Sequence, residues 1–386
     1  MSTDGKRYNI KGRQVTYMFW KFDISLSIFT GPRLFDIRFK GQFIAYEISV
    51  QELTSFYSGY KPTEHYFNFS DVRLVLGSRS KYLEPGVDCP IDATYVGSYF
   101  VDRSSNTPIH NARSFCVFEL NTEMPLRRHQ GYLRSSHRFY EGMTGGTEVK
   151  VSASGVIIAT YHGRQNPYSF EISENFNRKL KVTEKQAAYK HNILQPKLPV
   201  ISNNNIKDKF GNTPGYRILN TGLTHNIRPP GTGNEPGISW SRYQVAITNR
   251  KESEPGSSSI YQHKNPDQPI VRFQDFIDDD ENIIDKDIVA WITMGFHHIP
   301  TKEDLPDTHT PGTGQSFFLL PFNYFDENPA MSSRNAIRID PIDVKGQTKS
   351  VKVERYGVRK DIDCIPPKNY YDQVIKGDPC LEVQCL

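Results

Sequence analysis

The sequence predicts an all-β fold, and three observations lead to that prediction. Aromatic side chains, which favour strands, make up 12% of the 386 residues. The 25 prolines and 27 glycines interrupt the chain so often that long helices have little room. Between these breaks, short segments alternate polar and apolar residues with a period of two. Many short strands separated by turns are typical of a large β-sandwich.

The clearest strand pair is predicted between Leu34 and Val50. Apolar and polar residues alternate over 34–40 and again over 44–50, and Gly41-Gln42 between them predicts a hairpin turn. Further strands are predicted at Phe115 to Leu120, Thr147 to Val151, Val156 to Tyr161, Arg242 to Thr248, Asp287 to His298 and Ser316 to Phe325. Within 288–296 every residue except Thr293 is apolar or glycine, as in a strand covered on both faces.

The organisation of the chain follows from its loops and its tail. The segments 228–237 and 252–259 are rich in proline, glycine and serine and are predicted surface loops. From Asp343 the sequence is charged and poorly patterned. We therefore predict one large β-sandwich domain over residues 1–342 and a C-terminal tail over 343–386.

The charge and the apolar runs exclude two classes of partner. The net charge is +4 without a block of lysines and arginines, which argues against a nucleic-acid partner. No apolar run approaches the roughly 18 residues that a membrane helix needs, so we expect no membrane segment. The first residues, Met1 to Lys6, do not form the apolar core of a signal peptide. The sequence by itself therefore shows no localisation signal.

The chain holds five cysteines, at positions 89, 116, 364, 380 and 385. Cys89 precedes a proline at a predicted turn and Cys116 lies in a predicted strand. A bridge between them would close a loop and stabilise the fold by roughly 3 to 4 kcal/mol on the chain-entropy argument. Two buried thiols are the alternative, and the residue pattern leaves both open.

Several segments form longer motifs. In chain order they are Phe29 to Phe39, Pro85 to Pro90, Phe115 to Glu119, Pro125 to His129, Ser239 to Gln244, Glu254 to Ser259, Asp287 to Trp291, Gly295 to Pro300 and Pro321 to Glu327. Together they resemble the catalytic domain of the copper- and topaquinone-dependent primary-amine oxidases of the animal type. The resemblance covers about Gly12 to Ile337, without the small domains that precede the catalytic domain in that family.

The resemblance carries expectations about fold and chemistry. It implies a β-supersandwich, incomplete here, that forms a homodimer in an extracellular or cell-surface setting, with a disulfide between Cys89 and Cys116. It implies a copper ion held by a His-x-His pair and by a third histidine in a Gly-x-x-His-(Ile/Val)-Pro strand. A tyrosine in an Asn-Tyr-(Asp/Glu) motif becomes topaquinone, which forms a Schiff base with a primary amine before an aspartate removes the α-proton.

Four site residues follow from the resemblance. His298 matches the third copper ligand, Asp71 the catalytic base, Tyr57 the tyrosine that hydrogen-bonds the quinone oxygen, and Phe69 the gate aromatic. Outside that motif context, a strand-end histidine, a turn aspartate or a core tyrosine would be structural. Arg73, close to Asp71, introduces a further alternative, because an ion pair would hold the pKa of Asp71 below that of a useful base. Adjacent strand residues face opposite sides, so His297 is not expected to join His298 on one metal.

The rest of the expected machinery is absent from the sequence. Only Thr144-Gly145-Gly146 separates the two segments between which the family places its quinone strand. Asn323-Tyr324-Phe325 and Asn369-Tyr370-Tyr371 lack the acidic residue, and none of the eleven histidines forms a His-x-His pair. We therefore expect neither copper nor topaquinone in this chain and predict an inactive polypeptide, as skipped exons would leave. The alternative is a noncatalytic binding or structural module on the same scaffold.

Two calcium-type sites are also implied by the resemblance. Asp287 and the carbonyl of Ile288 match one half of the first, whose Asp-x-Asp partner is missing. The second would use Glu184, the carbonyl of Phe276, Asp278 and Glu281. A solvated acidic loop is the alternative for this second group.

Overall fold

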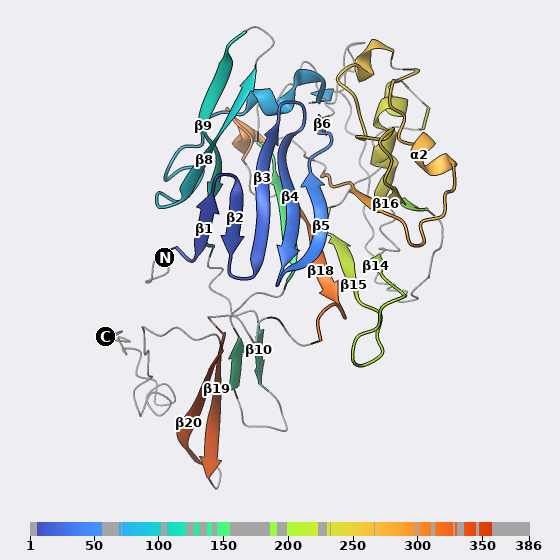
Figure 1. The fold of residues 1–386 in the computed structure, drawn as a ribbon. Coiled ribbons are helices and arrows are strands. Elements are labelled where there is room, and N and C mark those ends of the chain that lie inside the picture. The colour runs from blue at the N-terminus through green and yellow to red at the C-terminus, as the bar shows by residue number, and fades with distance from the viewer. Residues whose placement is uncertain are drawn as a thin grey trace.

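The fold of this chain is built almost entirely of antiparallel strands (Figure 1). The computed structural model describes residues 6–55, 69–70, 72–101, 106–120, 127–130, 137–140, 145–154, 186–190, 199–222, 230–231, 233–265, 267–296, 298, 301–309, 313–326, 329, 336–344 and 347–356. Within this part of the chain the helices are one short α-helix and five 3-10 turns. The all-β prediction is confirmed.

The first sheet is a five-stranded meander. Its strands, in order, are β1 (Tyr8–Lys11), β2 (Gln14–Tyr17), β3 (Trp20–Ser27), β4 (Gly31–Phe39) and β5 (Gln42–Ser49). The predicted hairpin is β4 and β5, and its turn is Lys40-Gly41, one residue earlier than expected. Lys40 and Gly41 have φ of 50° and 77°, the positive values that match the twist of a two-residue hairpin. Ile37 and Phe39 are buried on one face, as the alternation predicts.

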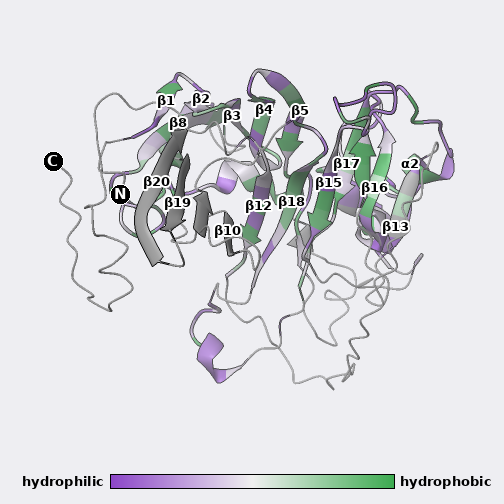
Figure 2. Cartoon of the chain, turned by 90° about the horizontal axis from the view of Figure 1, so that it is seen from below, coloured by the Kyte–Doolittle hydropathy of each residue, from purple (hydrophilic) through white to green (hydrophobic). Residues whose placement is uncertain are grey.

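Two further sheets pack face to face. One has the order β12 (Thr147–Ser152), β18 (Gly314–Phe322), β15 (Gly215–Asn220) and β14 (Val200–Ser202). The other has the order β13 (Ala187–Lys190), β16 (Tyr243–Asn249) and β17 (Ile288–Ile292). Ile218 of β15 and Leu319 of β18 meet Val245 and Ile247 of β16 in one buried cluster. Figure 2 shows this region as mostly hydrophobic strands, and the sandwich core lies here.

The opposite face of β16 is covered as well. Ala246 packs in a second buried cluster with Phe273 and Phe276, which come from the segment around α2 (Asp275–Asp278), and Trp291 of β17 lies against it. Burial on this face explains why the alternation of apolar and polar residues over 243–248 is broken by the apolar Ala246.

Strand β17 is shorter than the sequence predicts. It ends at Ile292, so the expectation of a strand reaching His298 is wrong. Side-chain hydrogen bonds surround the next residue: Asn220 Nδ2 donates to the Thr293 carbonyl at 2.7 Å, and Thr293 Oγ1 donates to the Trp240 carbonyl. His298 therefore lies in a loop, so the argument that adjacent strand residues face opposite sides does not apply to it. His297 and the predicted strand at 156–161 lie outside the described residues.

The remaining strands pair two by two. They are β6 (Thr54–Ser55) with β7 (Phe69–Ser70), β8 (Thr94–Val101) with β9 (Pro108–Val117), β10 (Arg127–Gln130) with β11 (His137–Tyr140), and β19 (Ala336–Val344) with β20 (Gln347–Tyr356). The last hairpin crosses the boundary at 342/343, so part of the segment that we predicted as a tail is a strand. No helix in the described part of the chain is long and apolar enough to span a membrane.

Candidate functional site

His298 lies in the loop after β17 and is held by a carboxylate. Its Nε2 atom is 3.0 Å from Asp304 Oδ2, at the end of the 3-10 turn η5 (Lys302–Asp304). Asp304 Oδ2 also accepts the Thr301 backbone N–H at 2.7 Å, and Thr301 and Asp304 form a capping box. The Thr301 N–H lowers the pKa of Asp304, against partial desolvation and with help from His298. A carboxylate on Nε2 orients the ring and leaves Nδ1 as the other coordinating atom.

The carboxylate that holds His298 is also within electrostatic reach of His309, which helps to lower the pKa of Asp304. The His298 imidazole is 34% exposed, whereas the Asp304 side chain is 3% exposed. No group of three or more His, Cys, Asp or Glu side chains suited to a metal ion occurs among the described residues. The role of His298 as a copper ligand stays a prediction.

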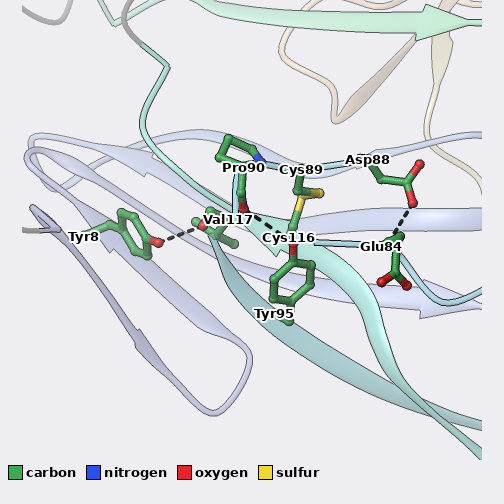
Figure 3. The surroundings of a disulfide bond; sticks show 8 residues. All are labelled: Tyr8, Glu84, Asp88, Cys89, Pro90, Tyr95, Cys116 and Val117. Carbon is green, nitrogen blue, oxygen red and sulfur yellow. Dashed lines mark hydrogen bonds between the residues drawn. A yellow bond between two sulfur atoms is a disulfide. The ribbon is translucent and has the colours of Figure 1, made fainter. Parts of the chain in front are cut away.

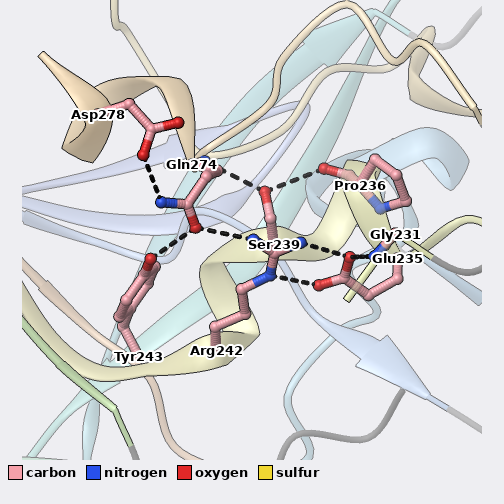
Figure 4. Close-up of polar contacts among 8 residues, drawn as sticks. All are labelled: Gly231, Glu235, Pro236, Ser239, Arg242, Tyr243, Gln274 and Asp278. Carbon is pink, nitrogen blue, oxygen red and sulfur yellow. Dashed lines mark hydrogen bonds and ion pairs between the residues drawn. The ribbon is translucent and has the colours of Figure 1, made fainter. Parts of the chain in front are cut away.

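A buried ion pair anchors the 3-10 segment η3 (Glu235–Arg242), as Figure 4 shows. Arg242 Nε and Nη2 each lie 2.6 Å from a carboxylate oxygen of Glu235, whose side chain is 1% exposed. The Glu235 hydrogen bonds raise the pKa of Arg242. Gln274 Oε1 accepts from Arg242 Nη1 and from the Tyr243 hydroxyl. Gln274 therefore connects the ion pair in η3 with β16 and the start of α2. Arg242 and Tyr243 belong to the motif 239–244, and their contacts here are structural.

The acidic loop after α2 divides its carboxylates between two networks. Asp278 Oδ1 accepts from Gln274 Nε2 at 2.7 Å and so joins the Arg242 network. Glu281 instead lies 2.7 Å from the ammonium of Lys251. Phe276 is buried in the core beneath α2. The three described members of the predicted second calcium-type group thus have three different environments.

The first calcium-type half-site lies at the start of β17. Asp287 is exposed, and its carbonyl accepts the Arg250 backbone N–H at 2.8 Å. Ile288 is half-buried and pairs with Asn249 of β16. Whether these oxygens bind calcium remains a prediction.

Cys89 and Cys116 form a disulfide, with their Cα atoms 6.6 Å apart (Figure 3). The bridge ties the turn at Pro90 to strand β9. Tyr8 of β1 donates its hydroxyl proton to the carbonyl of Val117, next to the bridge, at 2.7 Å. The expected disulfide is confirmed, and the alternative of two thiols is excluded.

The overall relationship of the chain follows from a comparison with known families. Residues 9–145 and 146–340 match the model of the copper amine oxidase enzyme domain. The chain belongs to the copper amine oxidase family. The two matched stretches meet between Gly145 and Gly146, within the three residues where the expected quinone strand is missing. The family resemblance of the sequence is thereby confirmed.

Relatives within the copper amine oxidase family are considerably longer than this chain. Copper-containing amine oxidase 3 of Bos taurus is 34% identical over 410 residues, covering 86% of this chain and 53% of the relative. Copper-containing diamine oxidase of Sus scrofa is 30% identical over 440 residues, covering 94% of this chain and 58% of the relative. The chain therefore spans a little over half the length of these relatives.

Solved copper amine oxidase structures share the fold. The crystal structure of the Pichia pastoris lysyl oxidase has a TM-score of 0.77 and 26% identity, covering 95% of this chain and 60% of that one. The Aspergillus nidulans amine oxidase has the same TM-score, 0.77, at 23% identity over 97% of this chain and 60% of that one. The β-sandwich of this family is therefore the fold of the chain.

The catalytic residues expected of an amine oxidase lie largely outside the described part of the chain. Tyr57 and Asp71 fall outside it, as does Glu184 of the predicted second calcium-type group, and Phe69 is described only as a residue of strand β7. The convergence of Tyr57 and Asp71 with His298 on one cavity stays a prediction.

Sequence reasoning missed two residues that the structure places at its candidate sites. Asp304, the partner of His298, had a readable signal, because Thr301-x-x-Asp304 has the spacing of a capping box. Lys251, whose ammonium contacts the acidic loop, had no such signal, because its partners Asp279 and Glu281 lie about thirty positions further along the chain.

Proposed function

We propose that this chain represents a copper- and topaquinone-dependent primary-amine oxidase, and that the polypeptide as written does not oxidise amines. The family reaction converts a primary amine, O₂ and water to an aldehyde, ammonia and hydrogen peroxide. One observation carries the proposal: a chain that matches the enzyme domain over 9–340 contains neither an Asn-Tyr-(Asp/Glu) motif nor a His-x-His pair.

The lengths of the matched regions support an internal loss. The bovine match runs over 410 residues but takes up 86% of the 386 residues here, which is 332, so 78 positions have no counterpart in this chain. The porcine match runs over 440 residues and takes up 94%, or 363, which leaves 77. Two relatives thus give the same deficit, enough for several strands. Skipped exons would produce such a deficit.

The residues of the chain do not fit the copper ion that the family implies. A copper site of this type needs three imidazoles, and two of them must come from residues i and i+2 of one strand to reach the same metal. His298 supplies one ring, with Nε2 occupied by Asp304. A single imidazole provides neither the geometry nor the affinity of the three-histidine site, so we derive no catalytic step through copper.

The tyrosine nearest to the expected motif has a packing role. Tyr324 follows Asn323, but its ring packs edge-on against Tyr216 and Phe325, and its hydroxyl donates to the Phe43 carbonyl at 3.3 Å. Burial raises the pKa of Tyr324, which disfavours the ionised form that an oxidation would use. Without a quinone, a base such as Asp71 has no substrate proton to remove.

A noncatalytic role is the second candidate, and the packing at the junction favours it. Gly145 lies beside the buried ring of Phe39 and the ring of Phe325, and its carbonyl accepts the Tyr216 hydroxyl at 3.1 Å. Gly145 is therefore packed against the core directly beside the junction. Such a scaffold would serve as a binding or structural module, as a homodimer if the family assembly persists.

The test is expression of the chain with added Cu²⁺ in air. Quinone staining, phenylhydrazine labelling and a peroxide assay with benzylamine, histamine and putrescine should all be negative. The bovine relative is the positive control. The matched variant is this chain with the segments that only the bovine relative has inserted between residues 143 and 172. Labelling of a tyrosine with copper-dependent peroxide release by the unmodified chain would overturn the proposal. Sequencing the transcript across this region distinguishes a splicing product from a true noncatalytic protein.

A further inference from the structure

Lys251 lies at the centre of a cluster of three carboxylates. Its Nζ atom is 2.5 Å from Asp279 Oδ2, 2.7 Å from Glu281 Oε1 and 3.0 Å from Glu254 Oε1. The three acids come from two separate loops, one after β16 and one after α2. An ammonium group has three N–H donors, and each has one carboxylate partner here.

The same carboxylates receive further N–H donors. Glu281 Oε2 accepts from Asn249 Nδ2 at 3.1 Å and from Gln186 Nε2 at 3.3 Å. A calcium ion would need several oxygen atoms directed at one point, at 2.3–2.6 Å from the ion. In this cluster the ammonium nitrogen takes that point, and both amides donate to the second oxygen of Glu281.

The predicted calcium-type group does not fit this arrangement. Asp278 lies in the Arg242 network, and Glu281 lies on Lys251. With one ammonium in place of a divalent cation, the three carboxylates and the cation have a net charge of −2. Partial exposure to solvent lowers the cost of this charge. The side chains of Glu254, Asp279 and Glu281 are 12%, 34% and 28% exposed.

We propose that Lys251 acts as a built-in cation that holds Glu254, Asp279 and Glu281 together, so that the acidic loop closes without calcium. This inference is independent of whether the chain oxidises amines. Although partial burial works against the charged form, the hydrogen bonds to Asp279, Glu281 and Glu254 raise the pKa of Lys251. The lysine therefore keeps its charge throughout the neutral range.

Removal of the lysine leaves ligands that suit a hard cation. Gln186 Oε1, Asn249 Oδ1 and Glu254 Oε2 are buried and have no hydrogen-bond partner among the described residues. Together with the carboxylates of Asp279 and Glu281 they supply neutral and charged oxygen atoms, the set that calcium prefers. Lys251→Met, which keeps the length of the side chain and removes the ammonium, should therefore gain calcium binding.

The experiment uses the full chain after treatment with a chelator, with calcium titration by calorimetry and thermal unfolding with and without calcium. We expect Glu281→Gln to leave any calcium response of the wild type unchanged. We expect Lys251→Met to bind calcium about tenfold more tightly or better, with a rise in Tm that Lys251→Met/Glu281→Gln loses. Lys264→Met, at an exposed lysine whose ammonium lies over the Tyr261 ring, is the matched control and should behave as the wild type.

Two results would overturn the inference. One is a calcium-dependent stabilisation of the wild type that Glu281→Gln abolishes, since this would place the ion in the cluster despite Lys251. The other is a folded Lys251→Met protein with no gain in calcium affinity. The Glu281→Gln arm decides the question even if Lys251→Met does not fold.

Discussion

Asp304 forms a hydrogen bond with His298 Nε2 and so constrains the orientation of the imidazole ring. The family motif pointed to His298 through Gly295 and the following Ile299-Pro300, because the spacing is specific. The motif did not point to Asp304, because that residue lies six positions later. Only the turn η5 brings its carboxylate to the His298 ring.

At this scale we expect Asp304→Ala to lower the free energy of unfolding by about 1–3 kcal/mol. The change removes the acceptor of the Thr301 N–H and leaves His298 without its carboxylate partner. Urea unfolding at neutral pH measures the loss. Lys302→Ala, an exposed change in the same turn, should stay within about 0.5 kcal/mol. Equal effects of the two variants would contradict a structural role for Asp304.

At the scale of the elements, two charged contacts hold separate segments together. The pair of Glu235 and Arg242 ties the two ends of η3 to each other, and Lys251 joins the loop after β16 to the loop after α2.

We expect Glu235→Gln to destabilise the fold by about 3–5 kcal/mol, because it leaves the guanidinium of Arg242 buried without its anion. Denaturant unfolding followed by tryptophan fluorescence is suitable, since Trp240 and Trp291 lie in the adjoining cluster. Glu252→Gln is the control, as that carboxylate is 85% exposed in its pair with Arg250 and should contribute below about 1 kcal/mol. A loss no larger than the control would show that the buried pair contributes little.

The disulfide is the second device at this scale. Cys116→Ala should cost about 3–4 kcal/mol, because the reduced chain regains the entropy of a loop whose ends are 27 residues apart. Unfolding with and without reductant tests this, and a variant with serine at 364, 380 and 385 keeps the bridge as control. An unchanged stability of Cys116→Ala would imply that the denatured state or native strain cancels the effect.

At the scale of the whole molecule, Phe39 joins the five-stranded meander to the sandwich. Its ring is fully buried and packs against Trp20 on one side and Phe325 on the other. The Tyr324 hydroxyl adds a hydrogen bond to the Phe43 carbonyl of β5. The sheets should therefore unfold together.

We expect Phe39→Ala to cost about 3–5 kcal/mol and to separate the unfolding of the meander from that of the sandwich. Calorimetry combined with far-ultraviolet circular dichroism would show two transitions in place of one. Phe43→Ala removes a ring that is 48% exposed on the neighbouring strand β5, and it should keep a single transition. A single transition in both variants would contradict the joining role of Phe39.

The sequence alone determined the fold class and the positions of several strands. Period-two alternation is a local property, so 34–50, 147–151 and 243–248 could be read directly from the chain, and the spacing of motifs identified the family and the missing His-x-His and Asn-Tyr-(Asp/Glu) motifs. It predicted the Lys40-Gly41 turn one residue late, because neighbouring turn registers differ only in backbone geometry.

The tertiary structure decided the features that depend on contacts between residues far apart in the sequence. Side-chain hydrogen bonds around Thr293 end β17 before the apolar pattern does, and Asp304 orients His298 from a turn. Lys251 reaches Asp279 and Glu281 across two loops. Pairings of this kind depend on which segments the fold brings within a few ångströms of one another. Separation along the chain does not encode that proximity, and so the acidic run gives no sign of the lysine that its carboxylates contact.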